Sequence, residues 1–205
     1  MVKAVTTQPK RAPAKAPKPV VRAKHEIRII GGLWKRSKLQ VADRHGLRPT
    51  PDRVRETLFN WLGQDLGGWR CMDAFAGTGV LGFEAASRGA AEVWMVEQDP
   101  GLVAQLKAAQ AKLRASATRI QRGDAIAALR QLGPGTMDLV FLDPPFDSTQ
   151  IEAALRAAAM ALKPTGLVYL EAPVAWGNER LAPVGMALQR HLKAGAVNAH
   201  LLKRV

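Results

Sequence analysis

Short apolar runs alternate with helix-periodic segments between residues 70 and 172, and this alternation restricts the fold more than any other feature of the sequence. The expected strands are 71–75, 92–96, 118–121, 137–142 and 167–171, and the expected helices are 81–87, 102–114, 125–132 and 151–162. Strands that alternate with helices form a parallel sheet covered on both faces and joined by right-handed crossovers. Segments 186–192 and 196–203 break this rhythm and predict a closing antiparallel hairpin. The sequence therefore predicts an α/β fold with a mostly parallel sheet.

The chain is expected to have three parts. Residues 1–25 contain four prolines, several basic residues and no Asp or Glu, and their apolar content is too low to offset the entropy of ordering. We interpret them as a disordered basic arm. Residues 26–63 form a small N-terminal extension, which starts with a short β-hairpin or meander over residues 27–41. Residues 64–205 form the main domain.

A helix is expected to complete the N-terminal extension. Thr50 has the residue type of an N-cap, Pro51 suits the first helical position, and Gly63 is typical of a helix end. Apolar residues recur between them at helical spacing. Arg53 and Arg55 lie in this helix and are candidates for contacts with phosphate groups of a partner, as is Arg48 just before it.

The charge is distributed unevenly along the chain. The formal net charge is +13, and residues 1–55 hold 15 of the 30 Lys and Arg residues but only three of the 17 acidic residues. A nearly neutral body with a basic front end is the distribution expected of a protein that binds a polyphosphate such as RNA. An anionic membrane surface would also attract this charge, but the segment has no amphipathic helix with a large apolar face.

Other classes of protein are disfavoured by what the sequence lacks. No run approaches 18 apolar residues, so no membrane span is expected. Cys71 is the single cysteine and the four histidines have no zinc-ligand spacing, so we expect neither a disulfide nor a metal. We expect a cytoplasmic protein that is a monomer.

Residues 77–82 spell G-x-G-x-x-G between an expected strand and an expected helix. The glycines allow a ligand to approach the backbone closely, and Glu97 follows 20 residues after Gly77 at the end of the next strand, where a carboxylate can accept hydrogen bonds from both ribose hydroxyls. The pattern indicates an adenosine-containing cofactor. Both NAD and S-adenosylmethionine fit the pattern.

Two acidic residues favour S-adenosylmethionine. Asp73 lies in the strand four residues before the first glycine, where it would attract an ammonium group and repel a pyrophosphate. Asp143 opens an Asp-Pro-Pro-Phe turn after the strand 137–142, at the sheet edge where ligands bind. The two prolines make this turn rigid and leave its carbonyls free to accept. A carboxylate, a carbonyl and an aromatic ring then form a pocket for a flat group that carries NH2.

Several segments resemble one known family. The stretches 73–79 and 143–146 are similar to the first and fourth motifs of class I amino-methyltransferases that use S-adenosylmethionine. The upstream stretches 29–32, 48–50 and 53–62 resemble the RsmD family, which methylates the exocyclic N2 of one guanine in bacterial 16S ribosomal RNA. The resemblance runs from about residue 28 to the C-terminus and implies a Rossmann-like methyltransferase fold with a seven-stranded sheet.

The resemblance also implies roles for individual residues. It implies that the cofactor is held by Asp73, Phe75, Gly77, Thr78, Gly79, Glu97 and Asp124. It implies that Asp143 and the carbonyl of Pro144 accept the two N–H bonds of the guanine amine while Phe146 stacks on the base, with Pro145 on the substrate side. The implied partner is 16S ribosomal RNA, within a 30S subunit or an assembly intermediate.

Three alternatives remain open from the sequence. The Asp-Pro-Pro-Phe turn recognises an NH2 group rather than a particular base, so adenine N6 in DNA or a protein glutamine could be the acceptor. An NAD-linked oxidoreductase is disfavoured by Asp73. A third alternative is a non-catalytic RNA-binding or assembly factor, which would bind RNA through the basic arm alone.

Overall fold

A computed structural model describes residues 26–41, 50–145 and 149–205. The strands are β1 (Glu26–Arg28), β2 (Lys38–Gln40), β3 (Arg70–Asp73), β4 (Glu92–Glu97), β5 (Thr118–Arg122), β6 (Met137–Leu142), β7 (Leu162–Ala172), β8 (Met186–Ala194) and β9 (Val197–Arg204). The helices are α1 (Asp52–Leu62), α2 (Val80–Ser87), α3 (Pro100–Leu113), α4 (Ala125–Gln131), α5 (Ile151–Ala161) and α6 (Asn178–Leu181), followed by a 3-10 turn at Ala182–Val184.

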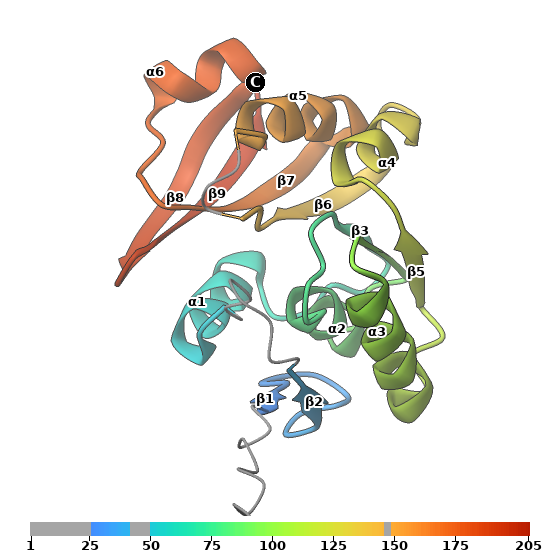
Figure 1. Ribbon diagram of the computed structural model, residues 1–205. Coiled ribbons are helices and arrows are strands. Elements are labelled where there is room, and N and C mark those ends of the chain that lie inside the picture. The colour runs from blue at the N-terminus through green and yellow to red at the C-terminus, as the bar shows by residue number, and fades with distance from the viewer. Residues whose placement is uncertain (1–25, 42–49, 146–148) are drawn as a thin grey trace, which may run out of the picture.

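The main sheet has seven strands in the order β5-β4-β3-β6-β7-β9-β8 (Figure 1). Neighbours from β5 to β7 run parallel, whereas β9 is antiparallel to both β7 and β8. Helices α1, α2 and α3 lie on one side of this sheet, and α4, α5 and α6 lie on the other. The expected parallel sheet with a closing hairpin is confirmed.

Strand β6 shows why the central strands are apolar along their whole length. Phe141 contributes to the core on the α1 side of the sheet, and its neighbour Leu142 contributes to the core on the α5 side. Both side chains are fully buried. Successive residues of a strand point to opposite faces, so a strand covered by helices on both faces needs apolar residues throughout.

Two features near the C-terminal half differ from the expected elements. Strand β7 begins at Leu162, directly after α5, and its first pair with Met137 precedes a register shift before Leu139. The sequence predicted the strand only from residue 167, because Lys163, Pro164 and Gly166 have low strand propensity. Helix α6 was not predicted, since four residues are too few to show a helical period.

The N-terminal extension forms the expected hairpin, in which β1 and β2 pair antiparallel. Ile27 and Leu39 face each other in register and are buried. The hairpin lies beyond α1 and α2, away from the sheet (Figure 1). Its turn is fixed to the end of α2, because the N–H of Leu33 donates to the Ser87 carbonyl at 2.7 Å and the N–H of Trp34 donates to the Ser87 hydroxyl at 2.9 Å.

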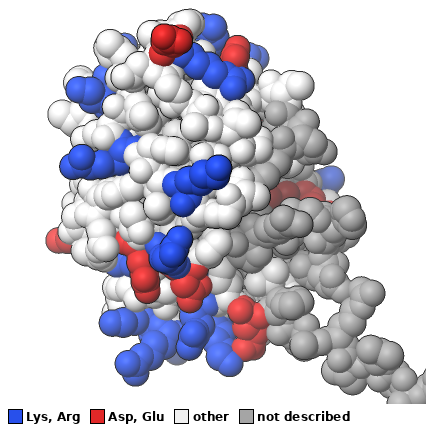
Figure 2. Space-filling view, turned by 90° about the vertical axis from the view of Figure 1, so that its left-hand side faces the viewer, with Lys and Arg blue, Asp and Glu red and all other residues white. Residues whose placement is uncertain are grey.

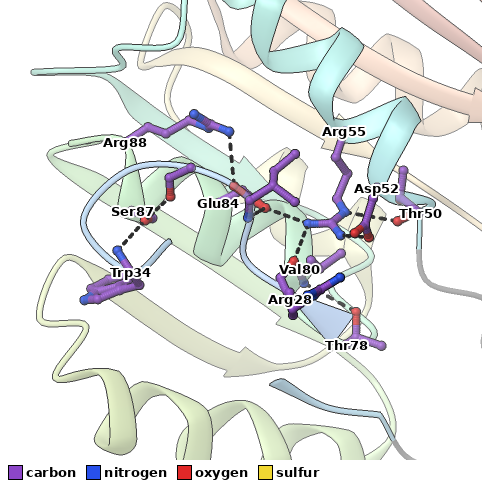
Figure 3. A network of polar contacts seen from close by, with 12 residues as sticks. Arg28, Trp34, Thr50, Asp52, Arg55, Thr78, Val80, Glu84, Ser87 and Arg88 are labelled. Atoms are coloured by element: carbon purple, nitrogen blue, oxygen red, sulfur yellow. Dashed lines mark hydrogen bonds and ion pairs between the residues drawn. The ribbon is translucent and has the colours of Figure 1, made fainter. Parts of the chain in front are cut away.

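A buried ion pair joins α1 to α2 and to the hairpin (Figure 3). The guanidinium of Arg55 donates to the Glu84 carboxylate at 2.6 Å, and both side chains have no exposed surface. Arg55 also donates to the carbonyl of Arg28 at 2.8 Å, while Glu84 accepts from the N–H of Ile30 at 2.7 Å. One ion pair therefore holds the strand-to-turn segment of the hairpin against the main domain.

Two expectations for this region need correction. Arg55 is not available for an RNA phosphate, because it has no exposed surface and its guanidinium donates to the carbonyls of Thr50 and Arg28 and to the carboxylates of Glu84 and Asp52. Thr50 is not the N-cap of α1, since that position is Pro51 and the helix has no side-chain cap. The Thr50 hydroxyl donates instead to Glu171, 121 residues away in the sequence, at 2.7 Å.

We predict that Arg55→Ala lowers the free energy of unfolding by about 3–5 kcal/mol, because it leaves the Glu84 carboxylate buried without its main partner. Arg53 lies two residues earlier in the same helix and is exposed, so Arg53→Ala should change stability by less than about 0.5 kcal/mol. Urea unfolding of the two variants measures both values. Equal losses in the two variants would contradict a structural role for the ion pair.

Candidate active site

The glycine turn and the double-proline turn begin at neighbouring strands. Strand β3 ends at Asp73 and β6 ends at Leu142, and the two strands are parallel with Asp73 opposite Phe141. From β3 the chain moves to β4 and β5 on one side of the sheet, then crosses to β6 on the other. Ligands bind in such sheets outside the carboxyl ends of the strands at this switch point. The two turns therefore share the sheet edge, as the sequence predicted.

Glu97 fixes the shape of the glycine turn. Its carboxylate accepts hydrogen bonds from the N–H of Gly77 at 2.9 Å and from the N–H of Asp99 at 2.8 Å. Gly77 has a φ of +51°, a backbone conformation that glycine adopts readily. A carboxylate has about four lone-pair sites, so two acceptor positions remain for other donors. Glu97 is half-buried and thus still reaches the surface of the site.

Gly79 forms the point where the turn enters α2. Its φ is +77°, and a Cβ at this position would lie 2.4 Å from Leu106 and 2.6 Å from Met95. The turn therefore has no space for a side chain here. Behind it the N–H of Gly82, in the first turn of α2, donates to the Asp73 carboxylate at 3.0 Å. Asp73 thus lies at the positive end of the α2 dipole, which favours negative charge.

The other surroundings of Asp73 nevertheless disfavour its charged form. It is 1% exposed, and burial raises its pKa to about 7. The hydrogen bond from Gly82 favours the charged form, but the nearby charges that act on Asp73, those of Glu97 and Glu171, are negative and raise its pKa further. A ligand with a cationic group would stabilise the ionised form. This charge distribution fits the ammonium of S-adenosylmethionine and does not fit a pyrophosphate.

Asp143 has a second carboxylate beside it. Strands β6 and β7 pair in register with Leu142 opposite Leu170, so the next position places Asp143 opposite Glu171. Glu171 is 3% exposed and accepts from the hydroxyls of Thr50 at 2.7 Å and Tyr169 at 2.8 Å. Burial and the charges of Glu171 and Asp73 raise the pKa of Asp143 well above its ordinary value.

The chain is similar along most of its length to known proteins. The family model described as "Conserved hypothetical protein 95" matches residues 27–203. A protein of Escherichia coli K12 named ribosomal RNA small subunit methyltransferase D is 41% identical over 181 residues, which are 87% of this chain and 90% of the relative. A Haemophilus influenzae protein of the same name is 44% identical over 154 residues, covering 73% and 80%. The chain belongs to the RsmD family.

A solved structure supports the fold of this RsmD family member. The Escherichia coli protein yhhF is similar with a TM-score of 0.76 at 40% sequence identity, and the match covers 88% of this chain and 98% of that one. The α/β Rossmann-like fold expected from the sequence is therefore confirmed.

The structure places most of the other predicted residues at the same edge of the sheet. Phe75 and Thr78 in the glycine turn are half-buried, Pro144 is buried and Pro145 is exposed. Asp124 is exposed and caps α4 by accepting from the N–H of Ala127 at 2.8 Å, while its other oxygen accepts from Gln98 at 3.1 Å. Arg48 and Phe146 lie outside the described residues.

Sequence reasoning missed two residues of this site. Glu171 was read only as the end of a strand, and Thr50 as a helix cap. A usable signal existed for Glu171, because a carboxylate at the carboxyl end of a parallel strand next to Asp143 belongs to the same sheet edge. No local pattern predicts the contact between Thr50 and Glu171, since it depends on how α1 packs on the sheet.

Gly79→Ala should lower both stability and cofactor affinity, because it adds a Cβ where φ is positive and Leu106 and Met95 leave no space. Gly63→Ala is the matched control, with a φ of +89° and no atom within 4 Å of the added Cβ. We expect a loss of about 1–2 kcal/mol for Gly63→Ala from backbone strain alone, and an additional loss of about 1–3 kcal/mol for Gly79→Ala from overpacking. Thermal unfolding and calorimetric binding measure these effects. Equal stabilities would contradict the steric argument.

Asp73→Asn should change how stability depends on pH. The pKa of Asp73 in the folded protein, about 7, is above that of an unfolded aspartate, so the folded protein binds the extra proton and loses stability as pH rises from about 4 to about 7. We expect Asp73→Asn to reduce this slope and to exceed the wild type in stability above pH 7 by up to about 4 kcal/mol, while cofactor affinity falls. Urea unfolding at several pH values tests this. An unchanged slope would show that Asp73 is not the titrating group.

Proposed function

We propose that this protein transfers a methyl group from S-adenosylmethionine to the exocyclic N2 amine of one guanine in 16S ribosomal RNA, in a 30S subunit or an assembly intermediate. The observation that carries the proposal is the convergence of the glycine turn and the Asp143 turn at one edge of the sheet, on neighbouring parallel strands. The relatives named ribosomal RNA small subunit methyltransferase D support the same activity.

The cofactor would be held by the residues around the glycine turn. The Asp73 carboxylate would pair with the ammonium group, and the backbone from Gly77 to Gly79 would contact the methionine part. Glu97 has acceptor positions left for ribose hydroxyls, and Asp124 lies at the next strand end, where it would accept from the adenine amine. When bound, S-adenosylmethionine supplies an electrophilic methyl group on a sulfonium centre.

The Asp143 turn would prepare the acceptor amine for attack. The lone pair of a guanine amine is delocalised into the ring, so the amine is a weak nucleophile. If the Asp143 carboxylate and the Pro144 carbonyl each accept one N–H, they hold the nitrogen near tetrahedral geometry and direct its lone pair at the methyl group. Asp143 then takes the proton that the methylated nitrogen must lose.

The N-terminal extension would bind the RNA backbone. Arg28, Lys35, Arg36 and Lys38 of the hairpin are exposed, and so is Arg53 of α1. Figure 2 shows the side of the molecule that lies at the left in Figure 1. Lys and Arg side chains gather at its lower end, at the height at which Figure 1 places the hairpin. Such a surface binds phosphates regardless of the nucleotide sequence. The target guanine must separately leave its base stack to reach Asp143.

One labelling experiment tests the proposal. The protein is incubated with methyl-labelled S-adenosylmethionine and, in separate reactions, naked ribosomal RNA, 30S particles, duplex DNA and a protein extract. The products are digested and the labelled nucleoside or residue is identified. Label in N2-methylguanosine from RNA supports the proposal. Label in N6-methyladenosine or methylglutamine would replace it with another acceptor, and no label in any reaction would refute it.

Asp143→Ala should reduce the rate of methyl transfer by about 100-fold or more, because it removes both an orienting acceptor and the proton acceptor. Cofactor affinity should remain within about threefold of the wild type, since the glycine turn is untouched. Glu56→Ala, at an exposed carboxylate of α1, is the control and should leave transfer unchanged. Turnover at the wild-type rate in Asp143→Ala would remove Asp143 from its role.

A further inference from the structure

Glu171 is a buried carboxylate that has no role in the reaction proposed above. It lies near the carboxyl end of β7, and the register of β6 and β7 places it opposite Asp143. Side chains two residues apart on a strand share a face, so Asp143 lies on the face of Phe141, which is the face of Asp73. Glu171 likewise shares the face of Tyr169. Three carboxylates on three adjacent strands thus point to the α1 side of the sheet.

Burial raises the pKa of both carboxyl groups of the pair, but two hydroxyls donate to Glu171 and favour its ionisation before that of Asp143. Thr50 and Tyr169 both donate to Oε1 of Glu171, and donation to a carboxylate stabilises its charged form. Burial and the charge of Glu171 hold the pKa of Tyr169 well above its ordinary value, so the phenol keeps its proton and remains a donor. The structure gives Asp143 no such pair of donors within the described residues.

The other titratable groups around the pair do not neutralise it. Asp73 on β3 is acidic. Arg55 on α1 donates its Nε proton to the Thr50 carbonyl at 3.1 Å and its terminal nitrogens to Asp52, Glu84 and the Arg28 carbonyl. On β9, His200 pairs in register with Leu170 and so faces the other side of the sheet. Burial lowers the pKa of His200 to about 4, so it is neutral near pH 7.

We propose that Glu171 is a positioning residue of the acceptor site, whose carboxylate bears the negative charge of the pair opposite Asp143 and thereby makes Asp143 a stronger base toward the amine. The consequence for catalysis rests on the proposed function. The effect of Glu171 on the protonation of Asp143 is independent of the proposed function and can be measured in the protein alone.

The effect on the reaction follows from the proton balance. As the carbon–nitrogen bond forms and the carbon–sulfur bond breaks, the electron pair of the broken bond stays on sulfur and the nitrogen becomes cationic. Its surplus proton passes to the Asp143 carboxylate, which leaves a neutral secondary amine. A base is most effective when its pKa lies near the working pH, and the charge of Glu171 raises the pKa of Asp143 in that direction.

The first experiment is a carbon-detected NMR titration of the Asp143 side-chain carboxyl in the full chain without cofactor or RNA. In Glu171→Gln the midpoint for Asp143 should move to lower pH by about one pH unit or more, because a like charge has been removed. Glu179→Gln, at an exposed carboxylate of α6, is the control and should leave the midpoint in place. A midpoint that stays within a few tenths of a unit in Glu171→Gln overturns the inference.

A second variant separates the charge from the shape of the site. Tyr169→Phe keeps the ring but removes one donor to Glu171, so Glu171 ionises less readily and the Asp143 midpoint should move in the same direction by a smaller amount. If Tyr169→Phe leaves the midpoint at the wild-type value while Glu171→Gln moves it, the contribution of the Tyr169 hydroxyl to the ionisation of Glu171 is overturned and only the effect of the Glu171 charge stands.

The third readout is the pH dependence of methyl transfer. For Glu171→Gln the acidic limb of kcat/KM should move to lower pH by the same amount as the NMR midpoint, and the plateau should fall because Asp143 is a weaker base. A uniform loss at all pH values without a displaced limb would indicate a merely structural role and contradict the proposal. Should no RNA be methylated by the wild type, the proposed function fails, while the NMR titration still decides whether Glu171 controls Asp143.

Discussion

Three carboxyl groups, buried at Asp73 and Glu171 and half-buried at Asp143, meet at one edge of a parallel sheet, and the rest of the structure has to stabilise them there. Asp73, Asp143 and Glu171 lie on adjacent strands and on one face, and burial raises the pKa of each. Grouping acids in a low-dielectric site opposes folding. The sheet can hold them there because its central strands are buried on both faces and supply the apolar stabilisation elsewhere. A cationic ligand would relieve the unfavourable charge, so the same grouping that weakens the free protein favours binding.

Polar contacts link this edge to the N-terminal extension. Glu84 on α2 binds the guanidinium of Arg55, Arg55 donates to the carbonyl of Thr50, and the hydroxyl of Thr50 donates to Glu171. The chain of contacts runs from the helix that starts at the glycine turn to the strand that borders the Asp143 turn. It passes through Thr50 and Arg55, in the second half of the N-terminal extension. The extension is therefore built into the main domain through buried groups rather than attached as a separate module.

The sequence was sufficient for the fold and for the two turns of the site, because both depend on local patterns. Strand and helix periods located nearly all the main elements, and the positions of Asp73 and Asp143 followed from strand ends. The failures have one cause. The burial of Arg55 and the partner of Thr50 are set by contacts between segments far apart in the chain. The local sequence around a helical arginine is the same whether its side chain is in water or bound to Glu84. Composition suggested a phosphate contact, and tertiary packing decided otherwise.

The presence of an aspartate at the acceptor turn has a chemical consequence of its own. An amide oxygen at position 143 could orient an amine by accepting a hydrogen bond, but it could not take up the proton that the methylated nitrogen loses. A carboxylate can do both only if it is ionised when the amine arrives and basic enough to accept afterwards. Burial favours its protonated form and raises its pKa. A neighbouring charge at Glu171 raises its basicity further, and a bound cation would restore its ionisation. A cation bound at Asp73 would offset the negative charge that Asp73 exerts on Asp143 and so favour the ionised form of Asp143.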